Sequence, residues 1–114
     1  MGYDYDIQTE CKHCKQTTRQ AELYTSYNHS WAFYGYLDKK QGLRWLYGKS
    51  GRATTKRLET MLECLEHLEN WEKNFDNAPE LGDGWEPTTG NAYWFAERIL
   101  KTAKTHPKSI WRGD

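Results

Sequence analysis

Two cysteines three positions apart are the residues of this sequence with the clearest chemistry. Cys11 and Cys14 flank a Lys-His dipeptide within a polar stretch. Two thiolates at this spacing, placed in a tight turn, bind one edge of a tetrahedral zinc ion. A structural zinc takes two further protein ligands, and a cysteine and a histidine three positions apart on a predicted helix offer them. We therefore predict a structural zinc, the only cofactor expected, with the ligands Cys11, Cys14, Cys64 and His67.

The same residues allow other interpretations. Cys64 lies beside Met61 and Leu68 in the helical pattern, where a buried cysteine without a metal is expected. His13 and His29 are alternative zinc ligands. A thioredoxin-like redox role for the cysteine pair is disfavoured, because no strand–helix–strand pattern surrounds it.

A basic segment leads into the longest predicted helix. Between positions 39 and 57 seven residues are positively charged and none is negatively charged. The free N–H groups at a helix start also favour anions. The alternative is a solvated basic loop that the acidic face of the helix neutralises. A phosphorylated or nucleotide-like ligand is expected to contact Asn28, Lys49, Arg52, Lys56 and Arg57.

The sequence contains no set of residues with catalytic spacing. Gly48-Lys49-Ser50 falls short of a nucleotide-hydrolysing phosphate loop, which needs a glycine at position 43, where the chain has leucine. The four histidines are scattered, and neither Gly-x-Ser-x-Gly nor His-Glu-x-x-His occurs. Glutamates on the long helix are expected to form a solvated face. We therefore do not expect an enzyme.

Two amphipathic helices are predicted, over about 54–75 and 91–105. In both, apolar residues recur at steps of three and four, which is the period of one helix face. Thr54 or Thr55 is expected to cap the first helix, and Pro107 stops the second. The apolar stripes are Leu58, Met61, Leu62, Leu65, Leu68, Trp71 and Phe75 in the first helix, and Ala92, Phe95, Ala96, Ile99, Leu100 and Ala103 in the second.

Residues near both ends of the chain favour strands. Positions 3–9 and 17–27 are expected to form a hairpin with the cysteine pair at its tip, and 109–112 a closing strand that pairs with the first. A short helix capped by Ser30 is expected over 31–37, and a loop over 77–90. The predicted architecture is a single α+β domain over residues 1–114. Its small antiparallel sheet comes from the N-terminal hairpin and the C-terminal strand and packs on the two main helices.

Composition limits the partners and the location of the protein. Six Trp, eight Tyr and three Phe argue for a folded core despite a mean hydropathy of −1.03. The net charge of zero gives no global attraction for nucleic acid or membranes. No signal peptide and no apolar run of roughly 18 residues is present. Three cysteines form no disulfide framework, so a cytoplasmic setting is expected.

Two stretches of the chain carry a family resemblance. One is Tyr-Thr-Ser-Tyr-Asn-His-Ser-Trp at 24–31, followed by the Gly-Lys-Ser-Gly loop at 48–51 and its helix. The other is Pro-Thr-Thr-Gly-Asn-Ala at 87–92, with the helix after it and His-Pro-Lys-Ser-Ile-Trp at 106–111. In order and spacing they resemble a family of small uncharacterised proteins encoded by bacteriophages, with relatives in actinobacterial genomes. The cysteine pair, Cys64 and His67 are not shared by all members of that family.

The resemblance implies a phage origin, a host-cell cytoplasmic location and an accessory role outside the virion. The family has no activity that can be carried over to this chain. The expected function therefore rests on what phage proteins of this size often do, which is to bind a host or defence component, and not on particular residues. The first hypothesis is a binding module that inhibits a host or anti-phage defence factor through its aromatic and charged faces. The alternative is a protein that sequesters a small nucleotide-like ligand. A third is a zinc-stabilised nucleic-acid-binding protein, which the zero net charge disfavours.

Overall fold

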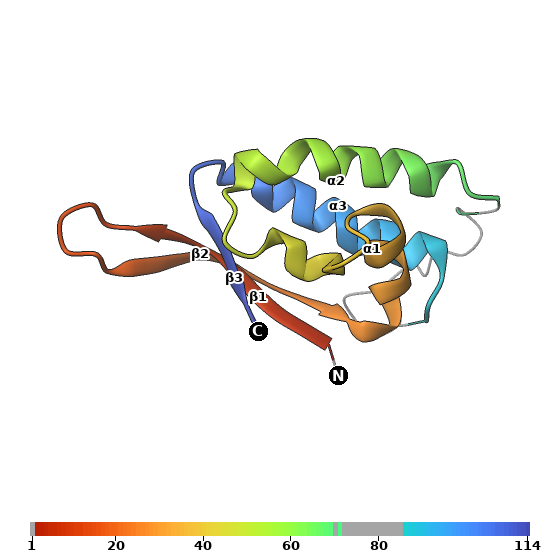
Figure 1. Ribbon diagram of the computed structural model, residues 1–114, viewed down its shortest axis with the longest axis horizontal. Helices are drawn as coiled ribbons and strands as arrows, with labels where there is room; N and C mark the ends of the chain where they lie inside the picture. Colours follow the sequence, from red (N-terminus) through yellow and green to blue (C-terminus); the bar gives the residue numbers. More distant parts are fainter. Residues whose placement is uncertain (1, 70, 72–85) are drawn as a thin grey trace.

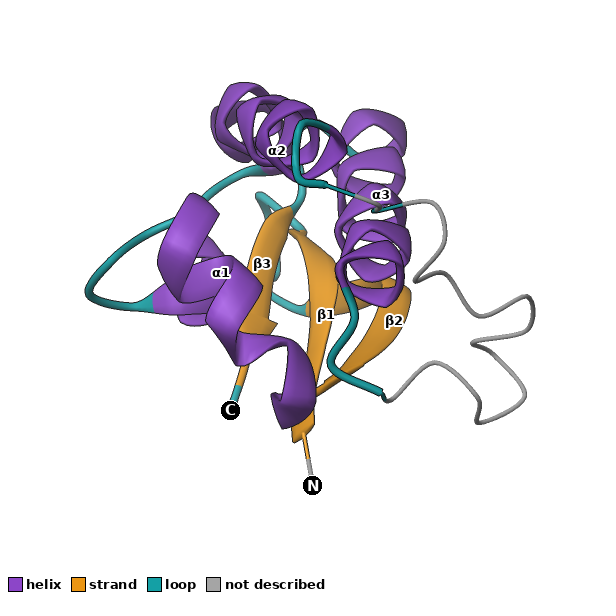
Figure 2. Ribbon diagram, turned by 90° about the vertical axis from the view of Figure 1, so that its right-hand side faces the viewer, coloured by secondary structure: helices purple, strands orange, loops and turns teal. Residues whose placement is uncertain are grey.

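The computed structural model describes residues 2–69, 71 and 86–114, which adopt an α+β fold as predicted. A three-stranded antiparallel sheet has the strand order β2-β1-β3. The helices α1, α2 and α3 lie on one side of this sheet (Figures 1 and 2). The molecule therefore has three kinds of surface on which a functional site can lie: the outside of the helical layer, the open face of the sheet and the projecting end of the sheet.

The sheet joins the two ends of the chain. The strands β1 (Gly2–Glu10) and β2 (Thr17–Ser26) form the predicted hairpin. On the other edge of β1, β3 (Ile110–Gly113) pairs antiparallel, with residue 5 opposite residue 113. The prediction that the closing strand pairs with the first is confirmed, and the first strand of the chain becomes the central one.

Side chains of β1 alternate between the two faces of the sheet, as a pleated strand requires. Tyr3, Tyr5 and Ile7 are buried under the helices, whereas the intervening residues face the opposite side. The register shifts directly after Ile7, and from there the hairpin leaves the body of the molecule. All residues from 9 to 20 are exposed, and we call this projecting part the hairpin arm (Figure 1).

The helices α2 (Gly51–Glu66) and α3 (Thr89–Thr105) supply most of the remaining core. The side-chain oxygen of Thr88 caps α3 by accepting the N–H of Asn91 at 3.2 Å. A hydrogen bond of 2.6 Å from the Tyr93 hydroxyl to Glu66 joins the two helices on the surface. The predicted stripes are confirmed for their buried members, which are Leu58, Met61, Leu62 and Leu65 on α2 and Ala92, Ala96, Ile99, Leu100 and Ala103 on α3.

The start of α2 differs from the prediction. Ser50, not Thr54 or Thr55, is the N-cap, and its hydroxyl accepts the N–H of Ala53 at 3.1 Å. Thr54 is fully buried one turn into the helix, and its hydroxyl donates to the carbonyl of Gly51 at 2.8 Å. A buried threonine bonded to its own helix is no cap, so the helix begins three residues earlier than expected.

The end of α2 is also earlier than predicted. The helix stops at Glu66 and His67 is its C-cap. Leu68 then turns back by donating its N–H to the carbonyl of Leu65 at 3.2 Å. Positions 70 and 72–75 of the predicted helix and 77–85 of the predicted loop lie outside the described residues.

The short predicted helix exists as α1 (Ser30–Tyr36), preceded by the 3₁₀ turn η1 (Tyr27–His29). Ser30 does not cap it. Instead, the hydroxyl of Ser26 caps η1 by accepting the N–H of Asn28 at 3.2 Å. A second 3₁₀ turn, η2 (Gly42–Leu46), leads back towards α2.

Trp111 ties the edge strand to the helices. Its side chain is fully buried, and its indole N–H donates to the Thr54 hydroxyl at 3.2 Å. Its ring packs against that of Tyr5 at a centroid distance of 5.9 Å. Its backbone N–H donates to the carbonyl of Lys49 at 3.0 Å, and its carbonyl accepts the N–H of Gly48 at 2.9 Å. A single residue thus bonds to α2, to β1 and to the loop before α2.

None of the described helices has both the length and the apolar character that a membrane span needs.

Candidate functional site

Three aromatic rings of the η1–α1 segment remain partly open to solvent. Tyr27, Trp31 and Tyr34 are 38%, 39% and 39% exposed, and their spacing of four and three residues is that of one helix face. We call these three residues the aromatic stripe. Large exposed rings gathered on one face are typical of protein-binding surfaces, where Tyr and Trp are enriched.

The aromatic stripe rests on a rigid base. The ring of Tyr27 meets that of Tyr3 edge to face at a centroid distance of 4.8 Å. The hydroxyl of Tyr3 hydrogen-bonds to that of Ser30 at 2.8 Å, and the Arg44 guanidinium lies 5.0 Å from the Tyr3 ring centroid. Tyr27 and the start of α1 are therefore held in place by Tyr3, which reduces the entropy lost when a partner binds.

A second candidate site is a pocket of about 420 Å³ that we call the basic pocket. It collects residues from α1, η2 and α2. Its volume falls within the range of small-molecule sites. Aromatic and cationic side chains share its wall, a combination that suits a ligand with a planar ring and an anionic group. The lining residues are Tyr36, Leu37, Trp45, Ala53, Lys56, Arg57 and Thr60.

Cations surround the Trp45 ring at this pocket. The Lys49 ammonium lies 4.5 Å and the Arg57 guanidinium 4.6 Å from the ring centroid. Arg57 also pairs with Asp38 at 3.3 Å. The backbone N–H of Gln41 is the main cause that lowers the pKa of Asp38, and the Arg57 charge adds to it. Asp38 therefore stays ionised and orients Arg57 without leaving an acidic group on the pocket wall.

The predicted ligand-binding residues fall only partly into this pocket. Lys56 and Arg57 line it, and Lys49 sits against Trp45 with its ammonium donating to the Trp45 carbonyl at 2.6 Å. Arg52 and Asn28 are not among the lining residues.

The start of α2 has fewer free N–H donors for an anion than the sequence suggests. The N–H groups of Gly51 and Arg52 donate to the carbonyls of Ser109 and Pro107, both at 2.9 Å, and the next N–H donates to the Ser50 cap. Because these three donors are engaged within the chain, the basic side chains have to carry any anion binding.

The cysteine pair lies where the sequence predicts it, at the tip of the hairpin. Cys11 and Cys14 are exposed in the turn that closes the arm. The pKa of the Cys11 thiol is lowered, first by the backbone N–H of Cys14, then by that of His13 and by the Cys14 thiol. A sulfur atom surrounded by N–H donors is stabilised as the thiolate, the form that binds metals and reacts.

The structure does not bring the four predicted zinc ligands together. Cys64 and His67 belong to the C-terminal end of α2, at the opposite end of the molecule from the hairpin tip (Figure 1). Across residues 2–69, 71 and 86–114, no group of three or more His, Cys, Asp or Glu side chains is placed to hold a metal. The alternative ligand His29 is fully buried and packs against the Phe95 ring at a centroid distance of 4.9 Å.

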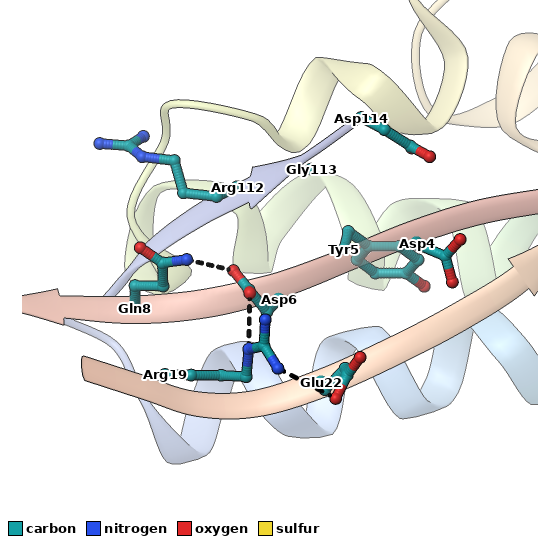
Figure 3. A pocket seen from close by; sticks show the side chains of 9 residues that line it. All are labelled: Asp4, Tyr5, Asp6, Gln8, Arg19, Glu22, Arg112, Gly113 and Asp114. Atoms are coloured by element: carbon teal, nitrogen blue, oxygen red, sulfur yellow. Dashed lines mark hydrogen bonds and ion pairs between the residues drawn. The ribbon is translucent and has the colours of Figure 1, made fainter. Parts of the chain in front are cut away.

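The open face of the sheet carries a polar hollow of about 270 Å³ that the sequence analysis missed (Figure 3). Asp6 is its centre, because it accepts from Arg19 at 2.8 Å and from Gln8 at 2.9 Å. Arg19 also pairs with Glu22 at 3.2 Å. This network joins β1 to β2 at the base of the hairpin arm, so its main effect is to hold the arm in place. The alternation of polar residues at 4, 6 and 8 was the available signal.

Comparison with known proteins gives no further guide. No family model, no curated protein and no solved structure matches this chain.

Proposed function

We propose that this protein is a non-enzymatic binding module whose aromatic stripe docks onto an acidic segment of a partner protein. The observation that carries the proposal is the exposure of Tyr27, Trp31 and Tyr34 along η1 and the short helix α1, where Tyr3 supports Tyr27. Rings of this kind provide large contact areas at a low cost in side-chain entropy. Trp and Tyr are also enriched among the residues that dominate binding energy at interfaces.

The charge around the stripe selects the kind of partner. Arg44 lies beside the ring that supports the stripe, and the segment that follows α1 contains only positive charges from Lys39 to Arg57. A cation beside the supporting ring, with further positive charge on the segment that follows, is complementary to an acidic partner and speeds the encounter with it. The resemblance to small phage-encoded proteins supports a host protein or a defence factor as this partner, and inhibition as the outcome of binding.

Replacing Trp31 by alanine is expected to weaken partner binding about 30-fold, as loss of a central aromatic contact does. Tagged wild-type and variant proteins are used to capture partners from a bacterial lysate in parallel. A protein retained only by the wild type is then purified and titrated calorimetrically against both, at low and at high salt. Binding to the wild type is expected to weaken as salt rises.

Tyr24→Ala is the matched control. Tyr24 is 46% exposed on β2, outside the aromatic stripe, so its loss is expected to leave the affinity unchanged. Equal affinities of wild type and Trp31→Ala for the purified partner would contradict the proposal. Self-association through the stripe alone would also contradict the proposal. It would be seen as a dimer of the wild type that Trp31→Ala does not form.

The basic pocket supports a second candidate function, the sequestration of a small nucleotide-like ligand. Lys56 and Arg57 would meet the phosphates, and the Tyr36, Leu37 and Trp45 side chains form the apolar wall. This candidate has its own observation, the 420 Å³ volume, and involves different residues from the aromatic stripe.

A thermal-shift screen against mono-, di-, tri- and cyclic nucleotides tests the pocket. A ligand present at 100 times its Kd is expected to add about 2.7 kcal/mol to the free energy of unfolding. That gain corresponds to a rise in Tm of about 10 °C. Arg57→Ala is expected to abolish the rise, whereas Arg52→Ala, outside the lining, is expected to keep it. No shift with any nucleotide would remove this candidate and leave the first one standing.

A further inference from the structure

We infer that the hairpin tip is half of a zinc site that a second copy of this chain completes, so that Cys11 and Cys14 of two chains hold one ion. The geometry of the tip, its position and its charge each support this inference. It is independent of the aromatic stripe and of the basic pocket.

The turn at the tip reverses the chain tightly around the cysteine pair. The N–H of Cys11 donates to the carbonyl of Gln16 at 2.8 Å, and the Cys11 carbonyl accepts the N–H of Lys15 at 3.0 Å. Lys15 takes the left-handed conformation, with φ of 63°, which lets the chain reverse directly after the second cysteine. Both cysteines are exposed within this turn at the end of the arm, and the Cys14 thiol lies 3.9 Å from the side-chain oxygen of Gln16.

Two ligands are too few for zinc, which takes four in a structural site. Every cysteine and histidine of the chain lies in the part that the structure describes, so a third thiolate or imidazole would be visible there. Within that part no third ligand joins the pair, and Cys64 lies at the far end of α2. In the proposed site the missing two ligands are supplied by another molecule.

A second copy is the occupant that the arm fits best. All residues from 9 to 20 are exposed and the arm projects from the body, so two tips can meet while the two bodies stay apart (Figure 1). A two-fold axis through the ion lets each chain contribute the same pair of sulfurs, which is the commonest symmetry of protein dimers. Zinc with four thiolates carries a net charge of −2, and Lys12 and Lys15 of each tip place compensating positive charge beside it.

The test is the zinc content and the mass of the reduced full-length chain after incubation with zinc chloride. Zinc is measured by elemental mass spectrometry, and the mass by light scattering coupled to size-exclusion chromatography. One zinc ion per two chains and a dimeric mass are expected, and a chelator is expected to return the protein to a monomer. Cys11→Ser and Cys14→Ser are each expected to lose both the zinc and the dimer, while the thermal melt stays in place because the arm is outside the core.

Three further variants make the result specific. Cys64→Ser and His67→Ala are expected to keep the zinc and the dimer, since the inference gives these residues no part in the site. His13→Ala is expected to keep them as well. One zinc ion per monomeric chain, the absence of zinc after incubation, or loss of zinc in any of these three variants would overturn the inference.

Discussion

Replacing Trp111 by alanine is expected to lower the free energy of unfolding by about 4 kcal/mol, the scale for removing a large ring from a packed core. The side chain is fully buried, packs on Tyr5 and donates its indole N–H to Thr54. Its loss leaves a cavity between the sheet and α2 and a buried hydroxyl without this donor. A domain of this size has about 5–15 kcal/mol in total, so this loss is a large fraction of its stability. Urea titration followed by circular dichroism measures the change.

Trp31→Ala is the matched control, because it makes the same substitution at an exposed position. It is expected to change the free energy of unfolding by no more than about 0.5 kcal/mol, as surface substitutions do. This result would also show that the binding test of the aromatic stripe is made on a folded protein. A loss of less than about 1 kcal/mol in Trp111→Ala would mean that β3 does not anchor the core.

Gly51→Ala is expected to destabilise the protein by about 2 kcal/mol, the scale for overpacking a tight contact. A Cβ atom at this position would lie 2.5 Å from the carbonyl oxygen of His106 and 2.6 Å from that of Ala103. Both atoms belong to the backbone, so the first turn of α2 would have to move away from the end of α3. Helix propensity alone predicts the opposite sign, since alanine is better than glycine in a helix by about 1 kcal/mol.

Gly35→Ala in α1 separates the two effects. A Cβ atom there would meet no other atom within 4 Å, so the gain in helix propensity is expected to appear in full. The free energy of unfolding is expected to rise by about 0.5–1 kcal/mol. Thermal melts of the two variants are compared under the same conditions. If Gly51→Ala raises the melt as Gly35→Ala does, the close approach of α2 to α3 is not a determinant of stability.

Periodicity was sufficient to predict the architecture, because the pattern of buried positions follows directly from helix and strand geometry. The stripes of α2 and α3 and the hairpin at 3–27 are where the apolar and β-forming residues place them. Helix ends were harder. Ser50, Thr54 and Thr55 all have hydroxyls that suit a cap, and only the packing of Thr54 against Trp111 shows which of them is inside the helix.

The candidate sites were predictable only where they are local in sequence. The cysteine turn is formed by neighbouring residues between two strands that the sequence predicts. Its position at the tip of the hairpin is therefore predicted correctly. The partnership with Cys64 and His67 depended on which end of α2 faces the hairpin. The spacing of residues along the sequence does not tell which end of a helix faces another element. In the structure α2 runs away from the arm, so its C-terminal end is far from the cysteine pair (Figure 1).

The aromatic stripe was also not predictable from the sequence, because it depends on tertiary contacts. The chain has seventeen large rings, and composition does not tell which of them pack and which face water. Phe33 and Trp31 are two positions apart on the same short helix, yet Phe33 is fully buried and Trp31 is 39% exposed. The difference arises from the side of α1 that contacts the rest of the molecule, which is a tertiary property.

The position of β3 beside β1 has a consequence for how the chain folds during synthesis. Tyr5 leaves the ribosome early, but its partner on the neighbouring strand is Gly113, more than a hundred residues later. Until Trp111 has emerged, one edge of β1 stays unpaired and the space above it stays unfilled. Contacts between residues so distant in sequence slow folding. The hairpin and the helices are therefore expected to remain incompletely packed until β3 has emerged, and during this interval the chain is most exposed to aggregation and proteolysis.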